Sequence, residues 1–125
     1  MMMKKILVID DNAEIRKLIK VSLGNKFQVS EADSAANASL RLEQDRPDLI
    51  LLDIMMPGIN GLDWCKLIRR WYQYNDMKII LVSALNQQHE IMEGLQSGAD
   101  GYITKPFSPT HLLNEVNRLF SEPAI

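Results

Sequence analysis

The chain has 125 residues, of which 46% are hydrophobic and 24% are charged, a composition typical of a single soluble globular domain. Its net charge of −2 does not favour a nucleic-acid or membrane surface, and no apolar run approaches the ~20 residues of a membrane span. The single cysteine, Cys65, excludes an internal disulfide and is typical of a reducing compartment. We therefore expect a cytoplasmic protein with one domain over residues 1–125, whose tail, 121–125, starts a linker or is a free end.

Hydrophobic periodicity divides the chain into five strands that alternate with five helices. Short aliphatic or β-branched runs predict the strands, at Lys5–Ile9, Phe27–Glu31, Leu49–Leu52, Lys78–Val82 and Gly101–Thr104. Apolar residues at helical spacing behind capping residues predict the helices, which run from Asn12 to Gly24, from Ser34 to just before Arg46, from Gly61 to about Tyr74, from Gln87 to Ser97 and from Ser108 to the tail. This alternation predicts an α/β fold, doubly wound, in which a parallel sheet has helices on both faces.

The third predicted strand carries an acidic residue at its end. The aliphatic run Leu49–Leu52 indicates a strand that is buried on both faces, and it stops at Asp53. Such a strand delivers Asp53 to the C-terminal edge of the sheet, where open α/β folds place their chemistry. Taken alone, this stretch leaves open whether Asp53 has a function or simply ends the strand or caps the next element.

Other polar residues follow the ends of the first, fourth and fifth strands, namely Asp10, Asp11, Ser83 and Lys105. Carboxylates that lie close together repel one another unless a cation neutralises them, and oxygen-only ligands suit a hard ion such as Mg²⁺. A hydroxyl and an ammonium beside an ion and a carboxylate are the groups that grip a phosphoryl group. Each residue alone also fits a cap, a turn or a solvated charge, but their common position favours a site.

Four stretches of the chain resemble the receiver domain of two-component response regulators. They are Val8–Asn12, Leu51–Gly61, Val82–Ala84 and Gly98–Phe107. The motifs occur in the order and spacing of the family, and the resemblance covers nearly the whole chain. It implies a flavodoxin-like (βα)5 fold with the strand order 2-1-3-4-5.

The resemblance also implies a phosphotransfer site. Asp53 would accept a phosphoryl group from a phosphohistidine of a sensor histidine kinase or a phosphotransfer protein. The implied ligands of Mg²⁺, for which Mn²⁺ can substitute, are Asp10, Asp11, Asp53 and the backbone carbonyl of Met55. Ser83 and Lys105 would bind the other phosphoryl oxygens.

A switch is implied by the same contacts. A phosphoryl group on Asp53 would attract Ser83, and Tyr102 would turn into the vacated space, which changes the face formed by the last two helices and the last strand. From its spacing alone, Tyr102 fits a half-buried strand aromatic equally well. The resemblance implies a cis Lys105–Pro106 peptide bond. It also places contacts with the kinase at Asn12, Ile15 and Arg16.

Two features of this chain depart from the common pattern of the family that it resembles. Met55 and Leu85 flank the line along which water would attack the phosphoryl group, and neither can orient a water molecule, so we expect slow self-dephosphorylation. The third helix also carries a second apolar stripe, Trp64, Leu67 and Trp71, which is either packing against a neighbouring helix or a docking patch for a partner.

The predicted output face differs from that of receivers that dimerise through it. Gly101 stands where such receivers have a second aspartate, and the fourth helix carries His89, Glu90 and Glu93 without basic members. We therefore expect a monomer or a weak, phosphorylation-dependent dimer. The domain itself is not expected to bind nucleic acid, and the sequence shows no effector domain.

Two other functions are alternatives to that of a receiver. A Mg²⁺-dependent phosphohydrolase with an aspartyl nucleophile would use similar groups, but its Asp-x-Asp motif follows the first strand, where this chain has Asp10-Asp11-Asn12. A nucleotide-binding protein would have a glycine-rich phosphate loop after that strand, which is absent from the sequence. We expect a signalling module that catalyses its own phosphorylation and dephosphorylation and is not a turnover enzyme.

Overall fold

A computed structural model describes residues 3–71 and 74–122 of the chain, and the last tail residues, 123–125, lie outside this part. Strands and helices alternate, and their bounds are β1 Lys5–Ile9, α1 Ala13–Leu23, β2 Gln28–Ala32, α2 Ala35–Gln44, β3 Leu49–Leu52, α3 Gly61–Arg70, β4 Lys78–Ser83, α4 Gln88–Gln96, β5 Gly101–Thr104 and α5 Pro109–Ser121. Within the described residues, no helix has the length and apolar character needed to cross a bilayer.

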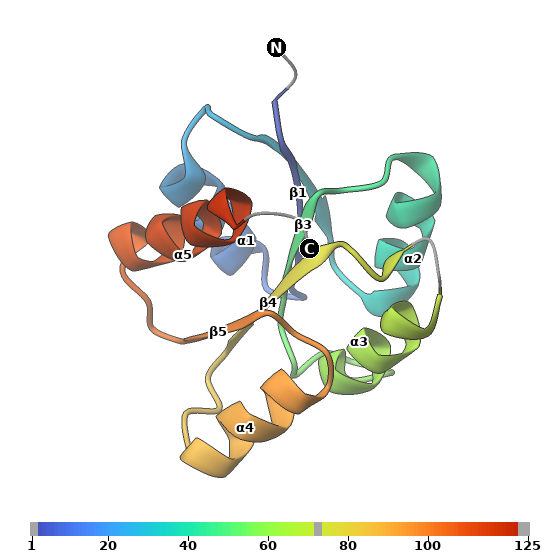
Figure 1. Cartoon of the computed structure of the whole chain (residues 1–125). Helices are drawn as coiled ribbons and strands as arrows, with labels where there is room; N and C mark the ends of the chain where they lie inside the picture. The colour runs from blue at the N-terminus through green and yellow to red at the C-terminus, as the bar shows by residue number, and fades with distance from the viewer. Residues whose placement is uncertain (1–2, 72–73, 123–125) are drawn as a thin grey trace.

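The five strands form one parallel sheet in the order β2-β1-β3-β4-β5. Figure 1 shows α1 and α5 together on one side of this sheet and α2 and α3 on the other. The predicted three-layer α/β fold and its strand order are therefore confirmed. Because all strands run the same way, their C-terminal ends share one edge of the sheet.

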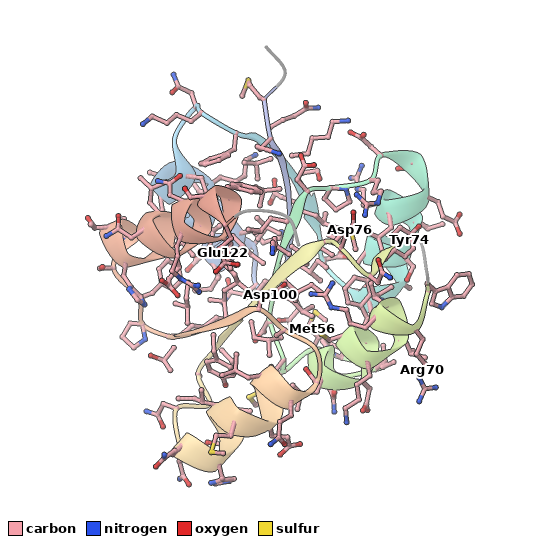
Figure 2. The ribbon with its side chains drawn as sticks, in the orientation of Figure 1. Met56, Arg70, Tyr74, Asp76, Asp100 and Glu122 are labelled. Atoms are coloured by element: carbon pink, nitrogen blue, oxygen red, sulfur yellow. The ribbon has the colours of Figure 1, made fainter. Side chains whose placement is uncertain are left out.

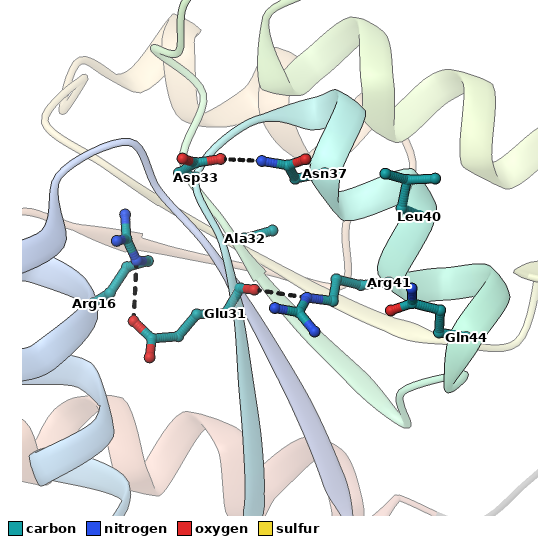
Figure 3. A pocket seen from close by; sticks show the side chains of 8 residues that line it. All are labelled: Arg16, Glu31, Ala32, Asp33, Asn37, Leu40, Arg41 and Gln44. Atoms are coloured by element: carbon teal, nitrogen blue, oxygen red, sulfur yellow. Dashed lines mark hydrogen bonds and ion pairs between the residues drawn. The ribbon is translucent and has the colours of Figure 1, made fainter.

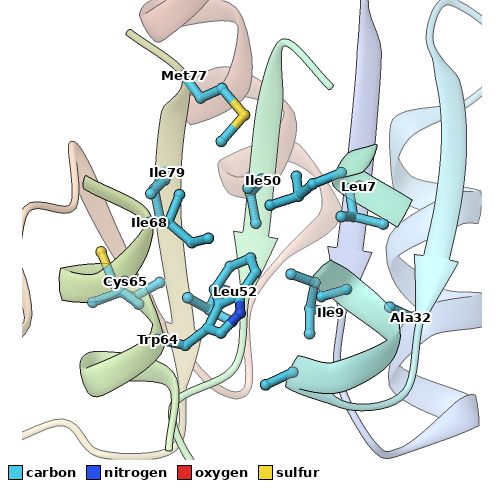
Figure 4. Close-up of a cluster of buried hydrophobic side chains, with 14 of the residues drawn as sticks. Leu7, Ile9, Ala32, Ile50, Leu52, Trp64, Cys65, Ile68, Met77 and Ile79 are labelled. Carbon is cyan, nitrogen blue, oxygen red and sulfur yellow. The ribbon is translucent and has the colours of Figure 1, made fainter. Parts of the chain in front are cut away.

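Two hydrophobic clusters hold the layers together, one on each face of the sheet, since successive strand side chains point to opposite faces. The first cluster joins the sheet to α2 and α3, and Figure 4 draws its members Leu7, Ile9, Ile50, Leu52, Trp64, Cys65 and Ile68 among others. The second joins it to α1 and α5 and includes Ile6, Val8, Leu49, Leu51, Ile19 and Leu112. The central strands are thus buried on both faces, which explains their unbroken aliphatic runs.

Most predicted boundaries agree with the structure because short-range caps define them. The side chains of Asn12, Ser34 and Ser108 accept hydrogen bonds from the first turns of α1, α2 and α5. Strand β2 is shifted by one residue, to Gln28–Ala32. The Lys105–Pro106 peptide bond is cis, as expected.

The third helix ends earlier than predicted. Its last residue is Arg70 rather than about Tyr74, and Trp71 has extended backbone angles of φ −84° and ψ 119°. The reason is tertiary: the guanidinium of Arg69 donates to the backbone carbonyls of Tyr74 and Met77, so the chain turns back beside the helix end. Figure 2 shows Tyr74 between the ends of α2 and α3.

The members of the predicted apolar stripe differ in their exposure to solvent. Trp64 is only 3% exposed, in the core between α2 and α3, whereas Leu67 is 42% and Trp71 58% exposed. Trp64, Leu67 and Trp71 line an apolar groove between the two helices. The packing interpretation is therefore right for Trp64, and Leu67 and Trp71 are open to solvent.

Candidate functional site

Backbone hydrogen bonds align the ends of the strands at the C-terminal edge of the sheet. The amide of Asp10 donates to the carbonyl of Ala32 at 3.1 Å, and the amide of Asp53 donates to the carbonyl of Ile9 at 2.9 Å. The amide of Lys105 donates to the carbonyl of Ser83 at 2.8 Å. These bonds extend the ladders by one residue beyond each strand, so residues far apart in sequence meet at one rim.

Three carboxylates converge at this rim. One oxygen each from Asp10, Asp11 and Asp53 lies within 4.8 Å of the other two. Asp10 and Asp53 are buried, at 2% and 6% exposure, while Asp11 is exposed. The ammonium of Lys105 is 2.8 Å from Oδ2 of Asp10 and 3.6 Å from Oδ1 of Asp53. The structure thus brings together four of the five residues predicted at the strand ends.

The electrostatics of this cluster disfavour an ionised Asp53. Burial raises the pKa of Asp53 above its ordinary value of 3.8, and the neighbouring Asp10 raises it further. Lys105 and the amide of Met55, which donates to Oδ1 of Asp53 at 3.3 Å, act in the opposite direction. A single lysine therefore does not compensate the three carboxylates. An oxygen-only cluster with excess negative charge fits a hard divalent cation such as Mg²⁺.

Ser83 lies one strand away from Asp53. Leu52 of β3 is paired with Leu81 of β4, so Ser83 is close to the level of Asp53 along the rim. Ser83 is fully buried, and its hydroxyl accepts a hydrogen bond from the amide of Leu85 at 3.2 Å.

Tyr102 lies inward, toward the loop that follows β4. Its hydroxyl donates to the backbone carbonyl of Leu85 at 2.6 Å. Burial raises the pKa of Tyr102, and a hydrogen bond with Ser83 opposes this rise. The Tyr102 hydroxyl and the Ser83 hydroxyl thus both hydrogen-bond to the backbone of Leu85.

The three residues predicted to touch a kinase begin α1, beside the acidic cluster. Asn12 is exposed and caps the helix, and Ile15 packs partly against the core. Arg16 is engaged within the molecule: its Nη1 donates to the carbonyl of Asp10 at 2.6 Å and its Nε to Glu31 at 3.0 Å. No pattern in the sequence indicates that Arg16 supports the loop that carries Asp10.

A polar cleft of about 500 Å³ adjoins this loop, between α1, β2 and α2. Figure 3 shows Arg16 and Arg41 on either side of Glu31, with Arg41 directed at the backbone carbonyl of Glu31. Both guanidinium groups are paired with groups of the cleft itself. The cleft therefore supports the loop that carries Asp10 through the guanidinium of Arg16.

A family model described as "Response regulator receiver domain" matches residues 6–117. The chain belongs to the response regulator receiver family. The resemblance drawn from the sequence is thereby confirmed, and the protein is a receiver domain of two-component signalling systems.

Known receivers agree with this assignment. The phosphate regulon transcriptional regulatory protein PhoB of Klebsiella pneumoniae is 40% identical over 116 residues, which make up 92% of this chain and 51% of PhoB. The solved receiver domain of the Francisella response regulator 1452 is 35% identical with a TM-score of 0.86, over 94% of this chain and 96% of that one. Chemotaxis response regulator CheY4 of Vibrio cholerae is 29% identical with a TM-score of 0.88, over 94% and 99%. The chain spans about half the length of the curated relatives it matches.

Proposed function

We propose that this receiver is switched by phosphorylation of Asp53. The observation that carries the proposal is the convergence of the Asp10, Asp11 and Asp53 carboxylates within 4.8 Å, with the Lys105 ammonium against two of them. A carboxylate oxygen of Asp53 attacks the phosphorus of a phosphohistidine, the P–N bond breaks, and the imidazole leaves with the electron pair and takes up a proton. The product is an acyl phosphate on Asp53.

Asp10, Asp11, Asp53 and the backbone carbonyl of Met55 would hold Mg²⁺ or Mn²⁺. The ion supplies positive charge that lowers the repulsion between an anionic nucleophile and an anionic phosphoryl group. The chain's own residues position the reaction: the rim holds Asp53 in place, and Lys105 and Ser83 bind phosphoryl oxygens.

The signal passes from Ser83 to Tyr102. Ser83 accepts a hydrogen bond from the amide of Leu85, and Tyr102 donates one to the carbonyl of Leu85, so a phosphoryl oxygen that recruits the Ser83 hydroxyl changes the loop that both side chains bind. Tyr102 lies on β5 and packs against α4, so its movement alters the face formed by α4, β5 and α5. The added charge on Asp53 would thus shift the equilibrium between two conformations of this face.

The partners follow from this role. We propose that a sensor histidine kinase or a phosphotransfer protein docks at the start of α1, with Asn12 and Ile15 in contact and Arg16 close by. The downstream effector is a separate protein or a further domain, since PhoB, a transcriptional regulator, is about twice the length matched here. Because β5 begins with Gly101 and α4 carries Glu90 and Glu93 without lysine or arginine, we propose a monomer or a weak, phosphorylation-dependent dimer.

Phosphorylation by acetyl phosphate tests the proposal. Wild-type protein with Mg²⁺ should gain one acid-stable, base-labile phosphoryl group, measured by intact mass spectrometry, and Asp53→Ala should gain none. Equal uptake by both proteins would refute the assignment of Asp53. Steady turnover of a small phosphate ester would instead favour the phosphohydrolase alternative.

A further inference from the structure

Helix α4 contacts the sheet through a glycine. Gly94 is the buried residue of α4, all of which is described, whereas Met92 and Leu95 are 51% and 42% exposed. Glycine is a poor helix former, so its place in the middle of a helical turn needs a packing reason. Figure 1 shows α4 lying beside β5, the strand that carries Tyr102.

The packing reason is the ring of Tyr102. A Cβ atom added to Gly94 would lie 2.8 Å from Cε2 and 3.0 Å from Cδ2 of Tyr102, and 2.8 Å from Cδ1 of Leu81. These distances are too short for real contacts, so a side chain at residue 94 forces one neighbour to move. The space that glycine leaves open is therefore occupied by Tyr102 and Leu81.

Tyr102 is the neighbour that can move. Leu81 is fully buried in the core between the sheet and the helices and has no open space to enter. Tyr102 is only partly buried, so its ring can rotate toward solvent. That rotation breaks the hydrogen bond from its hydroxyl to the carbonyl of Leu85.

The last turn of α4 is also the part that is held in place. The hydroxyl of the buried Ser97 donates to the carbonyl of Gly94 at 2.6 Å, and the amide of Ser97 donates to the same carbonyl at 3.1 Å. The first turn of the helix is solvent-exposed and is closed by the capping box of Gln87 and Glu90. Gly94 thus lies in a hydrogen-bonded last turn of α4, at the point where the helix meets Tyr102.

We propose that Gly94 is a positioning residue for the Tyr102 switch: the absence of a side chain at residue 94 lets the Tyr102 ring lie inward and couples the ring to α4. This proposal rests on the proposed function, in which Tyr102 responds to the phosphoryl group on Asp53. A residue with a side chain at position 94 shifts Tyr102 outward whether or not Asp53 is phosphorylated.

Nuclear magnetic resonance of fluorotyrosine-labelled protein tests the proposal. The chain has three tyrosines, and the signal that Tyr102→Phe removes identifies Tyr102. In Gly94→Ala, this signal should move toward that of a solvent-exposed tyrosine and lose its response to beryllium fluoride with Mg²⁺, an acyl phosphate mimic. A Tyr102 signal that keeps its wild-type position and response in Gly94→Ala overturns the proposal.

Gly101→Ala is the matched control, because a Cβ at Gly101 would meet no atom closer than 3.6 Å. Its Tyr102 signal should stay inward and responsive. If wild-type Tyr102 does not respond to beryllium fluoride, the proposed switch fails, and the comparison of Gly94→Ala with Gly101→Ala in the unphosphorylated proteins still decides whether Gly94 positions the ring.

Urea denaturation gives a second measurement that does not depend on the switch. Gly94→Ala should lower the unfolding midpoint of the wild type, despite the better helix propensity of alanine. In a Tyr102→Ala background the ring is gone and only the contact with Leu81 remains, so Gly94→Ala should lower the midpoint less than it does in the wild type. If Gly94→Ala alone does not fold, recovery of a cooperative transition in the double variant supports the proposal, and failure to recover overturns it. Equal decreases in both backgrounds also overturn it.

Discussion

Replacing Asp53 with asparagine should stabilise the protein at neutral pH when no divalent cation is present. The substitution keeps the shape of the side chain and removes one charge from a cluster of three carboxylates and one ammonium. The pKa of Asp53 is raised by burial and by Asp10, so the ionised carboxylate makes the folded state less stable. Asp53 would then be a residue of the proposed site whose replacement makes the folded state more stable.

The distances between Asp53 and the neighbouring charges give the size of this change in the free energy of unfolding. Oxygens of Asp10 and Asp11 within 4.8 Å of Asp53 repel it by at least about 3.5 kcal/mol each at an effective dielectric constant of about 20. Lys105, at 3.6 Å, attracts it by about 4.6 kcal/mol on the same scale. Solvent screens the repulsion between the exposed Asp11 and Asp53, whereas burial of the Asp53 charge destabilises the folded state further. We expect a net gain on the order of 2 kcal/mol for Asp53→Asn.

The pH dependence follows from the direction of the pKa shift. Because the pKa of Asp53 is higher in the folded state than its ordinary 3.8, the contribution of Asp53 to stability is complete below 3.8 and is lost as the pH rises through the raised pKa. The advantage of Asp53→Asn should therefore be full at neutral pH and absent below 3.8. Mg²⁺ should stabilise wild type more than the variant.

Urea denaturation followed by circular dichroism, in chelator and then in Mg²⁺, measures these free energies of unfolding. Glu93→Gln, which removes an exposed carboxylate from α4, is the control and should change stability little at any pH. An Asp53→Asn protein no more stable than wild type in chelator at neutral pH would refute the reasoning. A gain in stability of equal size below pH 3.8 would show that removal of the Asp53 charge is not the cause of the gain.

Three further measurements probe the site and the surface. Asp11→Asn should weaken Mg²⁺ binding at least about tenfold, or ~1.4 kcal/mol, by calorimetry; unchanged affinity would exclude Asp11 as a ligand. The Met55→Asn/Leu85→Glu variant should lose label from phosphorylated Asp53 faster than wild type, because both new side chains can orient water, and equal decay would end that explanation. Acrylamide should quench Trp71 and spare Trp64, which are 58% and 3% exposed; single-tryptophan variants separate the two signals, and equal shielding would contradict the exposed surface.

The local sequence was sufficient for the elements and for the acidic rim. The run Leu49–Leu52 is aliphatic because β3 is buried on both faces, and this pattern can be recognised within a few residues. Asp53 follows it directly, and parallel strands bring their C-terminal ends to one edge whatever the details of packing. Asp10, Asp11 and Lys105 could therefore be placed at the same rim before any coordinates were known.

Contacts between distant parts of the chain determine the features that the local sequence does not predict, such as the end of α3. The end of α3 depends on Arg69, whose guanidinium reaches Met77, Gly98 and Asp100 from another part of the chain. No pattern near Arg70 indicates such bonds, so hydrophobic periodicity alone predicts a helix that is too long.

The roles of two supporting residues, Arg16 and Gly94, also depend on contacts that the local sequence does not predict. The resemblance predicts a kinase contact at Arg16, and the structure shows that its guanidinium also donates to the carbonyl of Asp10. Gly94 is a glycine inside a helical pattern, which is a signal of close packing, but the pattern does not show which residue it packs against. Strand and helix propensities act over a few residues and can be read in order, whereas the closeness of residue 94 to residue 102 depends on how tightly a finished helix packs against a finished sheet.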